Sequence, residues 1–144
     1  MSGRMIAQCI MVLVSGLTLS EGIAASAELM PLDPVPAPYE DKHMPAGWWT
    51  DPKVIDKAKM IYVGEADPLV SCTGCHGEDG EPVRSGEGVR SLKNTKRFSD
   101  SYWFWRVAEG IPKTPMMPWK SLLSEEQIWQ VVAFMHTFSH GGKP

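Results

Sequence analysis

The segment Ser71–Gly80, SCTGCHGEDG, places two cysteines and a histidine within five consecutive residues of a 144-residue chain. The chain contains only one further cysteine, Cys9. A cysteine pair followed directly by a histidine has few chemical uses. The surroundings of Cys72, Cys75 and His76 therefore limit which folds and functions the chain can have.

Three common uses of paired cysteines fit poorly. A structural zinc site needs four ligands, and the chain has no second cysteine pair. A thioredoxin-like redox pair belongs next to a βαβ unit, and no strand-length alternation of apolar and polar residues occurs here. A disulfide between Cys72 and Cys75 would close a very short loop and stabilise the fold little.

Covalent attachment of haem is the interpretation that these residues favour. Two thiols can add to the two vinyl groups of one haem, and two intervening residues let one turn of backbone present both sulfurs. The imidazole of His76 follows Cys75 directly and can bind the iron. We predict one covalent haem c, attached through Cys72 and Cys75, with His76 as the proximal iron ligand.

The use of such a haem depends on the sixth iron ligand, because a thioether suits electron transfer whereas an open position binds gases or peroxide. Met116 and Met117 lie between two prolines, whose fixed backbone suits a rigid ligand loop. Met60 and Met135 fall at helical positions and are expected in the core. The distal ligand is therefore expected within the Met116–Met117 pair.

Start and stop signals predict three helices. The first begins at Pro52 and ends at Gly64, and the second runs from about residue 101 to 109 after the capping residue Ser99. A capping box at Ser124–Gln127 begins the third, which ends near Phe138. Because no strand pattern or internal repeat accompanies them, we predict an all-α fold.

Residues 1–27 have the features of a signal peptide: a basic residue, an apolar run over residues 5–19 and a small-x-small site at Ala25–Ala27. A retained membrane anchor is the alternative, although the run is shorter than the roughly 20 residues that a span needs. We predict export to the periplasm, with membrane anchoring if the segment is not cleaved. Cleavage would remove Cys9 and leave no cysteine for a disulfide outside the motif.

The rest of the chain divides into a proline-rich arm at residues 28–49, a domain at residues 50–140 and a tail at residues 141–144. The arm is expected to be extended and to lie outside the fold. Alternatively it lies along a partner or along its own domain, with Trp48 and Trp49 as anchors.

The charge pattern excludes one class of partner. The formal net charge is −3 and the basic residues are scattered, so nucleic-acid binding is not expected. Arg97 and Arg106 are expected to be solvated surface residues rather than partners of haem propionates.

The order of these elements from about Pro52 to Phe138 resembles the class I monohaem c-type cytochromes of bacteria. The resemblance implies three to five helices wrapped around one covalently attached haem. It implies Met116 as the distal ligand, counted from Trp119 and Leu123-Ser124, although the Met-Pro dipeptide points to Met117. Trp119 follows the methionine pair closely, and we expect it to pack against the haem edge or to donate its indole N–H to a haem propionate.

The resemblance implies a periplasmic electron carrier rather than an enzyme, with redox proteins as donors and acceptors and no small-molecule substrate. The type includes cytochrome subunits of respiratory enzymes. The alternative is therefore a haem c subunit of a larger membrane-associated respiratory oxidoreductase, bound through its N-terminal arm. A ligand-binding or peroxidatic haem protein would need an open sixth position.

Overall fold

Helices provide all the regular secondary structure in residues 33–83 and 89–139, the ranges that this computed structural model describes. The α-helices there are α1 (Ala37–Glu40), α2 (Pro52–Val63), α3 (Thr73–His76), α4 (Asp100–Glu109) and α5 (Glu125–Ser139). Short 3-10 helices are η1 (Trp48–Thr50), η2 (Leu92–Arg97) and η3 (Trp119–Ser121). The predicted all-α fold is confirmed. The predicted signal peptide and C-terminal tail lie outside the described residues.

Local capping explains where the three longer helices begin. The carboxylate of Asp51 accepts from the backbone N–H of Lys53 at 2.9 Å, directly before Pro52. The Ser99 hydroxyl accepts from the N–H of Tyr102 at 3.2 Å. Ser124 and Gln127 exchange the two bonds of a capping box, at 2.8 and 3.2 Å.

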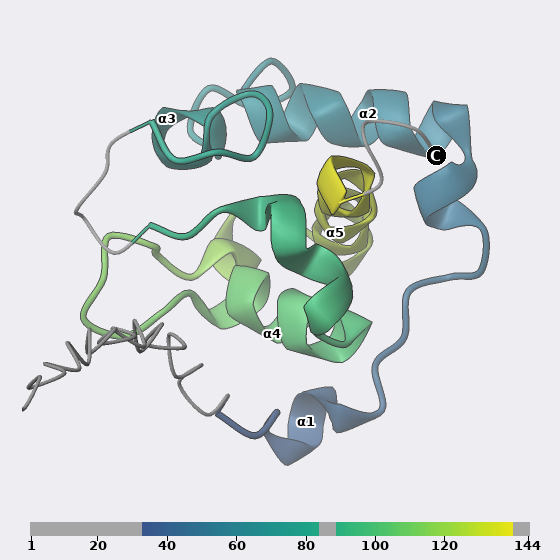
Figure 1. The fold of residues 1–144 in the computed structure, drawn as a ribbon, viewed down its shortest axis with the longest axis vertical. Coiled ribbons are helices and arrows are strands. Elements are labelled where there is room, and N and C mark those ends of the chain that lie inside the picture. The colour runs from purple at the N-terminus through teal and green to yellow at the C-terminus, as the bar shows by residue number, and fades with distance from the viewer. Residues whose placement is uncertain (1–32, 84–88, 140–144) are drawn as a thin grey trace, which may run out of the picture. The chain divides into compact units, whose positions relative to one another are not determined.

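The core lies where α2, α4 and α5 meet, and α2 passes across α5 in Figure 1. Ala58 and Tyr62 of α2 are fully buried, and the Tyr62 ring centroid lies 5.1 Å from that of Phe134 on α5. Met135 is buried as expected. The expectation for Met60 is wrong: its side chain is 43% exposed. It lies two residues from both Ala58 and Tyr62, which places it on the opposite side of the helix.

The expectation that the arm lies outside the fold is wrong for its described part, residues 33–49. Tyr39, Met44 and Trp48 pack against the hydrophobic core, and α1 lies against α4 (Figure 1). Lys42 also forms an ion pair of 2.6 Å with Glu125 in the first turn of α5. These apolar side chains among the prolines bury surface that an extended spacer would leave in water, so residues 33–49 lie along their own domain.

None of the helices in the described ranges has the length and apolar character needed to cross a membrane.

Candidate functional site

The C-x-x-C-H motif forms a single helical turn. Cys72 is the residue before α3, and its carbonyl accepts from the N–H groups of Cys75 at 3.2 Å and His76 at 2.9 Å. Both cysteines are free thiols; Cys72 is half-buried and Cys75 is exposed. One turn of backbone therefore carries both thiols and the imidazole, as the spacing predicted.

Burial dominates the electrostatics of this turn. Desolvation, with a smaller effect from Cys75, raises the pKa of the Cys72 thiol to about 12. Burial also lowers the pKa of His76, and the nearby backbone of Arg90 opposes that shift. The Nδ1 atom of His76 is nevertheless buried without a hydrogen bond of good geometry. His76 thus favours the neutral imidazole, the form in which histidine binds a metal.

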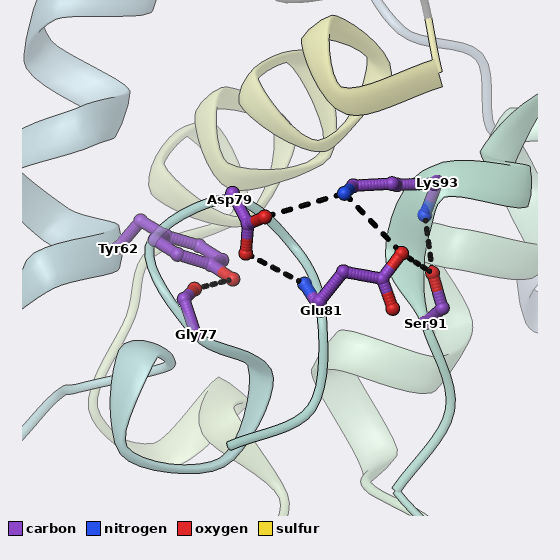
Figure 2. Close-up of polar contacts among 6 residues, drawn as sticks. All are labelled: Tyr62, Gly77, Asp79, Glu81, Ser91 and Lys93. Carbon is purple, nitrogen blue, oxygen red and sulfur yellow. Dashed lines mark hydrogen bonds and ion pairs between the residues drawn. The ribbon is translucent and has the colours of Figure 1, made fainter.

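The residue after the motif is fixed by α2. The Tyr62 hydroxyl donates to the Gly77 carbonyl at 2.8 Å (Figure 2). Gly77 has φ 68°, and a Cβ atom there would collide with the carbonyl of Glu81, so only glycine suits this turn. The N–H of Val83 returns to the carbonyl of Cys75 at 3.1 Å. These contacts fold the chain back against α3.

A polar cluster links this turn to η2, as Figure 2 shows. Lys93 lies 3.2 Å from Asp79 and 3.3 Å from Glu81, and Ser91 donates to Glu81 at 2.9 Å. The ion pairs are solvent-exposed and contribute little to stability. They join residues on either side of segment 84–88, which lies outside the described residues.

The methionine loop, defined here as residues 110–118, is closed at its base. The N–H of Ile111 donates to the carbonyl of Met116 at 3.0 Å, and the N–H of Met116 donates to the Thr114 hydroxyl at 3.2 Å. Gly110 has φ 67°, and a Cβ atom there would lie 2.6 Å from the carbonyl carbon of Met117. The backbone of Met116 and Met117 therefore lies directly on Gly110.

The two methionines differ in their surroundings. Met116 is half-buried and packs against the hydrophobic core, whereas Met117 is 45% exposed. Cys72 and Trp119 pack partly buried against the same core. In Figure 1, α3 and the loop between α4 and η3 lie on the same side of the view. The structure thus gathers Cys72, Met116 and Trp119 around one core.

These donors fit a covalently bound haem. Two free thiols in one turn suit thioether attachment, and a half-buried imidazole whose lowered pKa favours the neutral form suits ligation of a metal. Within the described residues, no three His, Cys, Asp or Glu side chains are grouped to hold a bare metal ion. A porphyrin supplies the other ligands of its own iron, so the motif needs no further protein donors on the proximal side.

Sequence reasoning missed several interactions around the site. Arg106 is wrongly expected at the surface: it is 7% exposed, stacks on Trp105 with 3.8 Å from guanidinium carbon to ring centroid, and pairs with Asp33. Tyr39 of the arm donates to Glu109, which also pairs with Lys120. The pairs of Arg106 with Asp33, Tyr39 with Glu109 and Glu109 with Lys120 each join different parts of the fold, so no local pattern could have revealed them.

Comparison with known proteins gives a family match over residues 56–135, to the family described as "Cytochrome C oxidase, cbb3-type, subunit III". No curated protein matches the chain.

Solved structures similar to this chain include two c-type cytochromes and one protein complex. The KustC0563 c-type cytochrome is 31% identical with a TM-score of 0.41, over 51% of this chain and 88% of that one. Cytochrome CL of the marine methylotrophic bacterium Methylophaga aminisulfidivorans is 20% identical with a TM-score of 0.45, over 62% of this chain and 56% of that one. The reducing HAO-like protein complex Kustc0457/Kustc0458 of Kuenenia stuttgartiensis gives 19% identity and a TM-score of 0.49, over 62% of this chain and 45% of that one.

Proposed function

The chain belongs to the c-type cytochrome family of the cbb3-type oxidase subunit III domain, and from this premise we propose that it is a periplasmic electron carrier with one His/Met-ligated haem. Membership of this family means a covalently bound haem c with iron, and haem-based electron transfer. The ligands, the compartment and the partners are the parts that we propose.

On the proximal side, Cys72 and Cys75 are the attachment points and His76 is the axial ligand. Their position on one helical turn supports this assignment, because the backbone of α3 fixes the spacing of all three side chains. The Tyr62 bond to the Gly77 carbonyl holds the end of this turn. Residues held in this way limit the movement of the ligand when the iron changes charge.

On the distal side, Met116 is the ligand, and the difference in burial between Met116 and Met117 is the observation that carries this proposal. The Met116 side chain packs against the core that Cys72 also contacts, whereas Met117 is largely exposed to solvent. A thioether ligand raises the reduction potential and closes the sixth position. Trp119 packs beside this loop and is proposed to contact the haem.

The bound haem supplies a one-electron change between Fe(II) and Fe(III). His76 and Met116 would be the protein ligands of its iron, and Cys72 and Cys75 would attach it to the helical turn that carries them. Cys75 is exposed, which supports access for partner redox proteins at the motif. The exposed apolar side chains of Leu69, Val83 and Met117 suit brief contacts with such partners.

The proposed location depends on residues 1–27, which lie outside the described residues. Mass spectrometry of the protein purified from its native cells would test it. A mature N-terminus near Glu28 is expected. An intact N-terminal segment in the membrane fraction would instead show that the protein is anchored to the membrane and not released into the periplasm.

A second candidate is an electron-transfer subunit of a larger respiratory oxidoreductase, which the description of the matched family favours. The inward-facing side chains of residues 33–49 already pack on their own domain, so within this range the solvent-facing side would be the one to bind a parent complex. Size-exclusion chromatography of native extracts separates the two candidates. A free carrier elutes at its monomer size, and a subunit elutes with its complex.

Redox-titrated absorption spectra of the wild type, Met116→Ala and Met117→Ala test the ligation. We expect the sulfur-to-iron band of the oxidised wild type to disappear in Met116→Ala and to persist in Met117→Ala. The reverse pattern would transfer the assignment to Met117. A wild type without this band, or one that binds carbon monoxide readily when reduced, would refute His/Met ligation.

A further inference from the structure

One carboxylate, that of Glu109, connects the N-terminal arm to the methionine loop. Glu109 is the last residue of α4, directly before Gly110. Its Oε1 atom accepts from the Nζ atom of Lys120 at 2.8 Å and from the hydroxyl of Tyr39. Lys120 belongs to η3, which follows the loop. The Glu109–Lys120 pair therefore spans the two ends of the loop, and Tyr39 holds the shared carboxylate.

The loop has little freedom to adjust without moving its base. Gly110 lies in contact with the backbone of Met116 and Met117, and the N–H of Ile111 is bonded to the carbonyl of Met116. Glu109 is joined through Gly110 to Ile111, whose N–H is bonded to the Met116 carbonyl, so a displacement of Glu109 would shift the Met116 backbone. The position of the Met116 side chain is thus sensitive to what fixes Glu109.

Tyr39 is itself held on the domain. Its ring packs against the core, with its centroid 6.1 Å from that of Phe104 on α4. Burial and the bond to Glu109 raise the pKa of Tyr39 to about 12, so the hydroxyl keeps its proton at neutral pH. The carboxylate pKa of Glu109 is lowered, first by Lys120 and then by Tyr39, so it stays ionised. Donor and acceptor are both in the state that the bond requires.

We propose that Tyr39 is a positioning residue for the distal ligand: through Glu109 and Lys120, the N-terminal arm holds the methionine loop in the position from which Met116 would bind the iron. The proposal rests on the proposed function in one respect, namely that Met116 is the distal ligand. Tyr39 lies outside the family match at residues 56–135, so this contribution comes from a part of the chain that the family does not describe.

Imidazole binding to the oxidised holoprotein measures loop opening, because imidazole can reach the iron only after the thioether leaves. The apparent affinity is then proportional to the open fraction of the loop. Removing one hydrogen bond to a partly exposed carboxylate, in Tyr39→Phe, should raise that affinity about fivefold. Lys120→Met should also raise it. Because both residues act through one carboxylate, the double variant should deviate from additivity.

Lys42→Met is the matched control. It removes the ion pair of 2.6 Å between Lys42 of the same arm and Glu125 at the start of α5, and it removes no contact of Glu109. We expect its imidazole affinity to equal that of the wild type. Equal increases in Tyr39→Phe and Lys42→Met would mean that loosening the arm anywhere has the same effect, and would overturn the specific role of Tyr39.

The outcomes separate the two proposals. If the wild type shows the sulfur-to-iron band and Tyr39→Phe binds imidazole no better than the wild type, the positioning role is refuted while His/Met ligation stands. If the wild type lacks the band, both proposals are refuted together. Far-UV circular dichroism of each variant confirms that any change occurs in a folded protein.

Discussion

Replacing Tyr62 by Phe should destabilise the fold by about 1–2 kcal/mol, because it removes one hydrogen bond and leaves a carbonyl without its donor. The hydroxyl lies 2.8 Å from the Gly77 carbonyl, and the side chain is fully buried. The ring packs with centroids 5.1 Å from Phe134 and 5.5 Å from Phe138, and phenylalanine keeps both contacts. The loss therefore comes from the hydroxyl alone.

Guanidinium unfolding of the holoprotein, followed by far-UV circular dichroism, gives the free energies to compare. Tyr62→Ala is the companion variant, expected to cost about 3–5 kcal/mol since it also removes a large aromatic ring from the core. A Tyr62→Phe protein within about 0.5 kcal/mol of the wild type would show that the bond contributes nothing measurable. A Tyr62→Phe protein as unstable as Tyr62→Ala would show that the hydroxyl determines the placement of the ring.

Two further predictions concern the base of the methionine loop and the ionisation of Tyr62. Gly110→Ala should lower the unfolding free energy by more than about 1 kcal/mol and weaken the sulfur-to-iron band, because φ is 67° and the added Cβ would collide with the Met116–Met117 backbone. Gly74→Ala is the control, because a Cβ atom at Gly74 meets nothing within 4 Å. Equal losses of stability in both variants would contradict the reasoning. Burial raises the pKa of Tyr62 above its ordinary value of 10.0. Just above pH 10 the Tyr62 hydroxyl therefore ionises only in the unfolded chain, and the free energy of unfolding should fall as the pH rises through that range. In Tyr62→Phe the unfolding free energy should depend less steeply on pH there, and an unchanged slope would exclude Tyr62 as the source.

Local chemistry explains what the sequence could predict. Helix caps depend on residues only a few positions apart, so the caps at Ser99 and Ser124 were visible without a structure. The haem motif is equally local, because its donors lie within a single turn. The helix caps and the haem motif are both defined by the spacing of residues along the chain, which can be read from the sequence.

Burial of single side chains required the fold. Met116 and Met117 are adjacent and of one type, yet one is half-buried and the other is exposed in the folded chain. Arg97 and Arg106 illustrate the same limit, since Arg97 is exposed whereas Arg106 is buried and pairs with Asp33 of the arm. Residues of one type become distinguishable only when elements distant in sequence are brought together.

The arm shows why composition alone misjudges such segments. Its prolines exclude a long helix, which is the basis for expecting an extended spacer, but they do not prevent isolated side chains from packing. Tyr39 packs against the core from the short helix α1, Trp48 from η1, and Met44 from the irregular backbone between them. Tyr39 also donates to Glu109, the carboxylate that pairs with Lys120. In our proposal, a movement of the arm therefore displaces the residues at the base of the methionine loop. The distal side of the site therefore depends on residues outside the family match, and similarity to that family alone would assign them no role.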